Sequence, residues 1–164
     1  MIRGLFPRPA RRVLFVCTAN VCRSPLAEAL LRHRLRAAGL QRAIAVSSAG
    51  TRVAQPGRPP DPRLRSLLDE RGVRLPRIRA RQATAAMVAE ATAVFVMSAA
   101  QRDELAALGA GPLPPVRQLR SLLGEDGDID DPYFSHPARF RAVFGEVAAA
   151  VDRLADELID AAGR

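Results

Sequence analysis

The chain has 164 residues, 48% of them hydrophobic, which suits one compact domain around one core. Its formal net charge is +8. No apolar run approaches the ~20 residues that a bilayer-spanning helix needs. Residues 1–10 are basic and lack the apolar region of a secretory signal, so composition argues against membrane and exported proteins. We expect a cytoplasmic protein with a flexible basic extension over residues 1–10 and a single domain over residues 11–164.

The arginines, the cysteines and the histidines argue against three further classes of protein. All 25 basic residues are arginine, and they are spread along the chain without interleaved aromatic residues, which argues against a nucleic-acid surface. Cys17 and Cys22 fall in one short segment, so they do not form the disulfide framework of a secreted domain. Neither His33 nor His136 has a second ligand at metal spacing, and we expect no metal and no other cofactor.

The first predicted element is an apolar strand over residues 13–16, followed by a loop and by a helical pattern that starts near Pro25. Proline suits the first turn of a helix, where its missing N–H is not needed. Where a strand runs into a helix N-terminus, free backbone N–H groups and the positive end of the helix dipole converge. This stretch therefore predicts an anion site.

The later segments alternate between strands and helices. The predicted strands cover residues 43–47, 93–97 and 116–119. The predicted helices cover residues 62–71 after a cap at Asp61, residues 80–90, residues 99–109 after a capping box of Ser98 and Gln101, and the region after Ser135. Residues 51–60 and 125–131 are predicted loops. Such alternation predicts a parallel sheet with ligand sites at the carboxyl ends of its strands.

Cys17 stands at the start of the first loop, and Arg23 follows after five residues. The N–H groups, the helix dipole and the guanidinium favour a thiolate, which is the nucleophilic form of cysteine. Arg23 offers planar, bidentate hydrogen bonds to two phosphate oxygens. The loop therefore predicts phosphate binding and attack on phosphorus; the simpler alternative is a buried cysteine beside a surface arginine.

Five motifs follow one another along the chain. They are V-C-T-A-N-V-C-R-S-P-L-A-E at residues 16–28, S-S-A-G-T at 47–51, G-R-P-P-D-P-R at 57–63, A-R-Q at 80–82 and D-P-Y at 131–133. In this order they resemble the low-molecular-weight protein tyrosine phosphatases, in a bacterial-type member. The resemblance implies a three-layer α/β/α fold with a four-stranded parallel sheet in the order 2-1-3-4. It also implies hydrolysis of phosphotyrosine-type aryl phosphates through a phosphocysteine.

The resemblance also implies the roles of individual residues. Cys17 would be the nucleophile, Arg23 would bind the phosphate oxygens, and Asp131 would protonate the leaving oxygen. The remaining phosphate-binding residues would be Thr18, Ala19, Asn20, Val21, Cys22 and Ser24. Support of the loop and the pocket wall would come from Ser48, Tyr133 and Phe134.

The acidic segment at residues 125–131 carries more than one candidate acid. Asp128 and Asp130 lie close to Asp131, but Pro132 restricts Asp131 to extended or turn conformations and makes its direction more fixed. The spacing of the aspartates also suggests the start of a calcium loop. However, Asp131 stands where such a loop needs glycine, so we do not predict calcium.

Four positions depart from the family pattern. Ile78 stands where eukaryotic members carry a histidine, and Ser98 replaces an aspartate that often follows the third strand. Ala54 falls where many members place an aromatic residue on the pocket wall, and Phe134 replaces a second tyrosine. We expect these changes to alter substrate preference more than reaction type.

Two rival functions stay open beside the phosphatase. An arsenate reductase on the same fold needs resolving cysteines away from the loop; this chain has none, although an external thiol could substitute. A module that binds phosphate or nucleic acid without turnover would not need Cys17, Arg23 and Asp131 together. The expected partner is a phosphotyrosine protein or a small aryl phosphate, and we expect a monomer or weak dimer without membrane contact.

Overall fold

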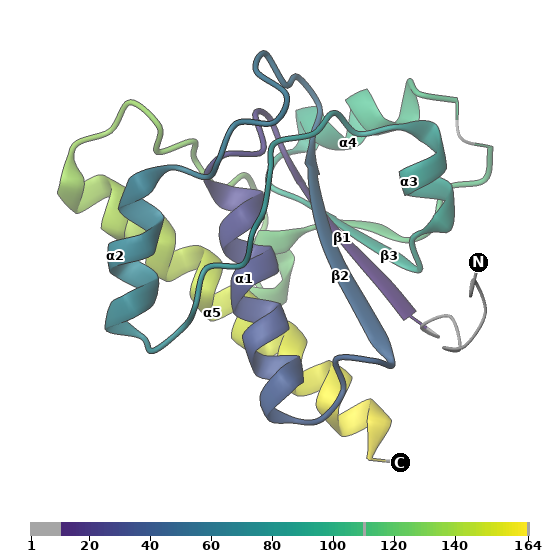
Figure 1. Cartoon of the computed structure of the whole chain (residues 1–164). Coiled ribbons are helices and arrows are strands. Elements are labelled where there is room, and N and C mark those ends of the chain that lie inside the picture. Colours follow the sequence, from purple (N-terminus) through teal and green to yellow (C-terminus); the bar gives the residue numbers. More distant parts are fainter. Residues whose placement is uncertain (1–10, 110, 164) are drawn as a thin grey trace, which may run out of the picture.

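The computed structural model describes residues 11–109 and 111–163, so the predicted extension over residues 1–10 lies outside the described residues. The strands are β1 (Arg11–Cys17), β2 (Ile44–Gly50), β3 (Ala93–Val96) and β4 (Val116–Gln118). The helices are α1 (Arg23–Ala37), α2 (Pro62–Glu70), α3 (Ala85–Glu90), α4 (Ala99–Ala106) and α5 (Pro137–Ala162), with a 3-10 helix, η1, at Leu119–Leu123 (Figure 1).

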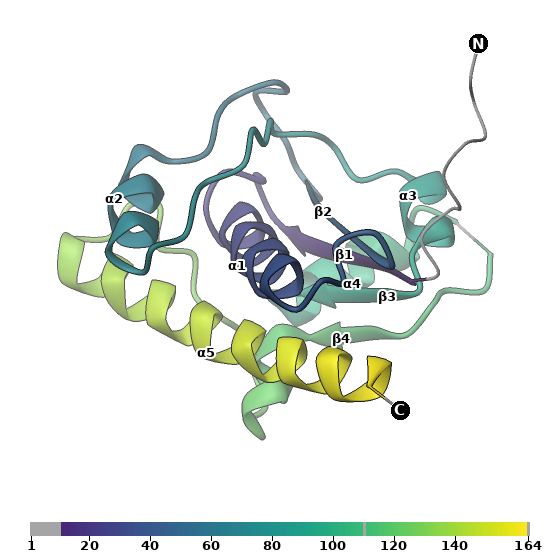
Figure 2. The same cartoon turned by 60° about the horizontal axis from the view of Figure 1, so that its bottom comes forward.

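The four strands form one parallel sheet in the order β2-β1-β3-β4, which confirms the predicted topology. Helices α1 and α5 lie side by side on one face of the sheet, while α3 and α4 pack on the other (Figure 2). Because β1 is central, its carboxyl end lies between two neighbouring strands, where parallel sheets bind ligands.

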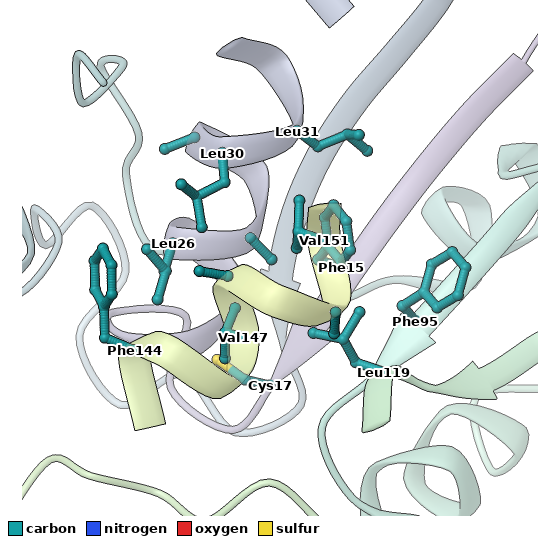
Figure 3. Packing of buried hydrophobic residues seen from close by; sticks show 14 of the residues in the cluster. Phe15, Cys17, Leu26, Leu30, Leu31, Phe95, Leu119, Phe144, Val147 and Val151 are labelled. Carbon is teal, nitrogen blue, oxygen red and sulfur yellow. The ribbon is translucent and has the colours of Figure 1, made fainter. Parts of the chain in front are cut away.

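Alternating side chains of β1 feed the two halves of the core. Phe15 and Cys17 belong to the cluster that α1 and α5 cover, and Phe15 packs against Phe95 with ring centroids 5.8 Å apart (Figure 3). Leu14 and Val16 belong to the smaller cluster beneath α3 and α4. With both faces buried, β1 holds the first residue of the loop, Cys17, on a rigid support.

One predicted helix is partly wrong. Residues 80–84 were expected to be helical, but the helix α3 begins only at Ala85, after Thr84 has capped it through a hydrogen bond of 3.2 Å from the N–H of Met87. The preceding residues are extended because Gly50 donates to Arg81 O at 2.9 Å and its own carbonyl accepts from Ala83 N at 2.8 Å. Pairing with the end of β2 therefore outweighs the helix propensity of this alanine-rich segment.

The other boundaries shift by a few residues. The strand predicted over residues 116–119 ends at Gln118 and continues as η1, and the last helix begins at Pro137 with His136 as its cap. The cap at Asp61 and the capping box of Ser98 and Gln101 are where they were predicted. Among the described residues, no helix combines the length and apolarity needed to cross a membrane.

Candidate active site

The loop between β1 and α1 forms part of a pocket of about 240 Å³. Cys17, Arg23 and Asp131, which the sequence singles out for catalysis, line this pocket together. Its other lining residues are Ala19, Val21, Cys22, Arg58, Tyr133 and Phe134. The remaining predicted residues do not line it: Thr18 is half-buried, while the buried polar group next to the loop comprises Asn20, Ser24 and Ser48.

The loop directs its carbonyl groups away from its N–H groups. The carbonyl oxygens of Cys17, Thr18 and Val21 accept hydrogen bonds of 2.8–2.9 Å from the segments that follow β2 and precede α2. Within residues 11–109 and 111–163, no backbone N–H of residues 18–22 donates a hydrogen bond. Five consecutive unpaired N–H groups next to a helix N-terminus form a cradle for an anion.

Asn20 holds the loop in this shape. Its φ of 56° makes it the one non-glycine residue with a positive φ in the described chain. Its amide donates to Ser24 Oγ at 2.8 Å and to Ser48 Oγ at 3.0 Å, and its oxygen accepts from Arg81 N at 3.1 Å. These three hydrogen bonds offset the cost of a left-handed conformation, which asparagine tolerates better than most residues.

The buried network extends from the cysteine to a glutamate. Ser24 Oγ lies 2.9 Å from Cys17 Sγ, and Ser48 Oγ donates to Glu28 Oε2 at 2.5 Å. Burial raises the pKa of Glu28, although the Ser48 hydrogen bond and the Arg32 guanidinium act in the opposite direction. Glu28 was not among the predicted site residues. A glutamate among the apolar residues of α1 was the available signal.

Arg23 is only 5% exposed, and the two terminal nitrogens of its guanidinium both contact the acidic segment. One terminal nitrogen donates to Ile129 O at 2.8 Å, and the other lies 3.3 Å from Asp131 Oδ2. Ile129 N in turn donates to Met97 O at 2.8 Å, which anchors the acidic segment to the end of β3. Arg23 Nε has no hydrogen-bond partner among the described residues, so this donor is free to bind an anion.

The three candidate acids have different neighbours. Asp128 Oδ1 accepts a backbone N–H of the first turn of α4 at 3.0 Å, and Asp130 forms an ion pair with Arg139 of α5. Asp131 lines the pocket, is half-exposed, and accepts the N–H two residues further along at 3.1 Å. Of the three, Asp131 is the one whose carboxylate faces the same space as Cys17 and Arg23.

Arg58 and two aromatic residues form the rim of the pocket. Arg58 donates to the Tyr133 hydroxyl at 2.8 Å, and its guanidinium lies 5.3 Å from the centre of that ring. Tyr133 meets Phe134 edge to face at 4.7 Å, and Phe134 is 96% exposed. Arg58 was not among the predicted site residues, although it lies within the G-R-P-P-D-P-R motif.

Cys22 lies beside a buried carboxylate. Its Sγ is 3.7 Å from Asp61 Oδ2, which also accepts a hydrogen bond of 2.8 Å from Arg63. Burial, followed by the charge of Asp61, raises the pKa of Cys22 well above its ordinary value. Burial alone would raise the pKa of Asp61 too, but the hydrogen bonds from Arg63 bring it below its usual range. Cys22 is therefore a thiol at neutral pH.

Two further contacts position the loop. Gln101, which pairs with Ser98 in the capping box of α4, also donates to Thr18 Oγ1 at 3.1 Å. At the end of β2, a Cβ on Gly50 would lie 2.5 Å from Thr18 O and 2.7 Å from a Val53 methyl group, so only glycine fits there. The Gln101 contact joins residues 83 positions apart, which explains why sequence reasoning missed it.

Two positions outside the family pattern, Ala54 and Ile78, and the histidine His136 lie away from the pocket. Ala54 is exposed and is not part of the pocket lining, so the aromatic surface of the pocket comes from Tyr133 and Phe134. Ile78 is buried, and His136 Nδ1 caps α5 by accepting a backbone N–H at 3.2 Å. Residues 11–109 and 111–163 contain no cluster of three or more histidine, cysteine, aspartate or glutamate side chains arranged for a metal.

The chain is similar to known phosphatases over most of its length. A model of the low molecular weight phosphotyrosine protein phosphatase family matches residues 12–162. A probable low molecular weight protein-tyrosine-phosphatase, EpsP of Ralstonia solanacearum, is 34% identical over 142 residues, which cover 87% of this chain and 92% of that protein. A protein-arginine-phosphatase of Geobacillus stearothermophilus is 32% identical over 148 residues, covering 90% and 95% of the two chains.

Similarity to solved structures points the same way. The crystal structure of YfkJ from Bacillus subtilis matches with a TM-score of 0.82 and 26% identity, and the match covers 95% of this chain and 96% of that one. The fold, the site and the relatives thus agree, and the chain belongs to the low molecular weight protein tyrosine phosphatase family of hydrolases.

Proposed function

We propose that the protein hydrolyses aryl phosphate monoesters of the phosphotyrosine type through a phosphocysteine. The observation that carries the proposal is the set of five unpaired N–H groups at residues 18–22, between the Cys17 thiol and the free Nε of Arg23. Donors aimed at the oxygens of a transferring phosphoryl group stabilise the charge that builds up in the transition state.

In the first step, the Cys17 thiolate attacks phosphorus and an S–P bond forms. The P–O bond to the aryl group breaks, and the leaving oxygen takes a proton from Asp131. The carboxylate of Asp131 then accepts a proton from water, whose oxygen attacks phosphorus and breaks the S–P bond. Inorganic phosphate leaves, and the thiolate and the protonated Asp131 are restored.

The walls of the pocket support an aryl substrate. Ala19, Val21, Tyr133 and Phe134 give it apolar and aromatic surfaces on which a phenyl ring can pack. The relatives include both tyrosine and arginine phosphatases, so phosphoarginine is the natural competitor. Arg58 at the rim disfavours it, because its guanidinium would face the cationic guanidinium of the arginine product.

Release of phenol from phenyl phosphate tests the proposal directly, with phosphoarginine and arsenate as parallel substrates. We expect turnover of the aryl ester to exceed that of phosphoarginine and to need no added thiol. Faster turnover of phosphoarginine would assign the chain to the arginine-specific relatives. Thiol-dependent arsenate reduction without ester hydrolysis would support the reductase instead.

The nucleophile is tested by two serine variants of the loop. Cys17→Ser should abolish turnover and retain binding of inorganic phosphate, because the N–H groups and Arg23 remain. Cys22→Ser should keep most of the activity, since Cys22 is held as a thiol by its surroundings. An inactive Cys22 variant beside an active Cys17 variant would reverse the assignment.

The proposed reaction depends on a reduced Cys17, so we place it in the reducing cytoplasm.

A further inference from the structure

A second groove, of about 740 Å³, lies between α1, α2 and the segment that follows α2. Its lining is strongly basic, because the arginines outnumber the two aspartates, Asp61 and Asp69, by four. The arginines are Arg32, Arg36, Arg65, Arg74, Arg77 and Arg79. All six are exposed, and all six line the same groove.

Most of this charge is not neutralised by the protein. Arg32 pairs with Glu28, and Arg79 donates to the carbonyl of Ile78 next to it. For the other four arginines of the groove, the described part of the chain places no carboxylate within ion-pair distance. Asp61 is already bound by Arg63, so it does not compensate them. The groove therefore concentrates uncompensated positive charge.

The groove and the catalytic pocket share a wall. Arg58 lines the pocket, while the next two residues, Pro59 and Pro60, line the groove. Asp61 lines the groove as well, and its carboxylate is 3.7 Å from Cys22 Sγ in the pocket lining. An extended polypeptide that places a phosphorylated side chain in the pocket can therefore continue across residues 58–60 into the groove.

The lining also favours a polypeptide over a nucleic acid. None of the residues that line the groove is phenylalanine, tyrosine or tryptophan, so it offers no aromatic platform on which bases stack. It instead combines the arginines with prolines and Leu75, which suit the charged groups and the stems of acidic side chains. We propose that the groove binds an acidic segment of the phosphoprotein substrate, adjacent to its phosphotyrosine. This inference rests on the proposed function.

The test compares two phosphotyrosine peptides that differ only in their flanks, one with glutamates on both sides and one with glutamines. The groove variant carries Arg65→Glu, Arg74→Glu and Arg77→Glu. Its matched control carries Arg42→Glu, Arg117→Glu and Arg153→Glu, which changes the net charge equally at exposed positions away from the pocket and the groove. Hydrolysis of p-nitrophenyl phosphate reports on the catalytic pocket alone.

At low salt we expect the acidic peptide to be preferred roughly tenfold in kcat/KM, since each exposed ion pair changes binding by about 1.5- to 5-fold. The groove variant should lose this preference and the control should keep it, with p-nitrophenyl phosphate hydrolysed equally by all three proteins. Equal rates on both peptides in the wild-type protein, or an equal loss in the control, would overturn the groove as a substrate site.

Binding separates this proposal from the proposed function. An unphosphorylated, fluorescent acidic peptide should bind the wild-type protein and the control, and not the groove variant, whether or not any ester is hydrolysed. Absence of all hydrolysis would overturn the proposed function. The binding assay would still test whether the groove binds the acidic peptide. Displacement of the peptide by a single-stranded oligonucleotide at lower concentration than by a second acidic peptide would show that the groove prefers nucleic acid.

Discussion

The guanidinium of Arg23 lies 3.3 Å from the carboxylate of Asp131, across the pocket that Cys17 also lines. Arg23 is nearly buried and fixed through Ile129, whereas half of the Asp131 side chain is exposed. We expect a phosphate that binds Arg23 to take over this contact. In the proposed mechanism, Asp131 is then available to protonate the leaving oxygen while its segment stays anchored through Ile129.

The first prediction concerns Asp131 as the general acid. Asp131→Asn should slow turnover of phenyl phosphate by roughly 10²–10⁴-fold, because the poor leaving group then departs without a proton. The loss should shrink for a nitrophenyl phosphate, whose leaving group needs less protonation. Steady-state rates on the two esters measure this difference, and an equal loss on both would remove Asp131 from the role.

Asp130→Asn is the matched control for that experiment. Asp130 is paired with Arg139 and does not line the pocket, so its loss should change turnover far less than that of Asp131. The same two esters are compared. A larger loss in the Asp130 variant would mean that the acidic segment presents a different carboxylate to the substrate.

The second prediction is a redox response with a definite pH dependence. Peroxide oxidises the Cys17 thiolate to a sulfenic acid; Cys22 then attacks its sulfur, a disulfide forms and water leaves. Because the pKa of Cys22 is raised by burial and by Asp61, little of it is thiolate at neutral pH. Disulfide formation should therefore accelerate as pH rises above neutral.

Mass spectrometry of acid-quenched samples checks this response. We expect a Cys17–Cys22 disulfide and recovery of activity with dithiothreitol. Sulfinic acid at Cys17 with free Cys22, or a rate of disulfide formation that is flat with pH, would contradict it. Cys22→Ser is the control, because Cys17 in that variant should proceed to irreversible oxidation.

The third prediction concerns the left-handed residue of the loop. Asn20→Ala removes three hydrogen bonds and replaces asparagine, which tolerates a φ of 56°, by a residue that does not, so it should destabilise the protein by roughly 2–4 kcal/mol. Asn20→Gly should recover about 1 kcal/mol of that loss, because glycine accepts the backbone conformation. Urea unfolding measures both. Equal stability of the two variants would show that backbone conformation contributes nothing here.

The fourth prediction follows from the raised pKa of Glu28. Such a carboxyl has a higher pKa in the folded than in the unfolded protein, so it stabilises the fold fully when the pH is below its pKa in the unfolded protein. This stabilisation is lost as the pH rises through its pKa in the folded protein. The melting temperature of the wild-type protein should therefore fall relative to that of Glu28→Gln as pH rises above 4.5, the ordinary pKa of a glutamate. Glu157→Gln, at an exposed position, serves as control. A constant difference between wild type and Glu28→Gln would disprove the linkage.

Local signals explain why the loop could be predicted. Cys17 and Arg23 are six positions apart in one strand-loop-helix unit, so their meeting needs no knowledge of the rest of the fold. The sheet order was implied by resemblance and was confirmed. Asp131 could be proposed as the acid from its motif. What distinguishes it from Asp130 is the ion pair of Asp130 with Arg139, and that pair forms only once α5 has packed in place.

Other features had no local signal. Arg58 meets Tyr133 across 75 positions, and Gln101 meets Thr18 across 83, so neither contact follows from spacing or periodicity. The extended residues before α3 depend on backbone pairing with Gly50, which competes successfully with local helix propensity.

The buried network of Asn20, Ser24 and Ser48 has a consequence for the enzyme under working conditions. These buried side chains hold the loop in shape through hydrogen bonds to one another. A cradle built in advance fits inorganic phosphate, the last product, as well as it fits the phosphoryl group of a substrate. We therefore expect product inhibition, so that accumulating phosphate slows the enzyme and ties its rate to the phosphate content of its surroundings.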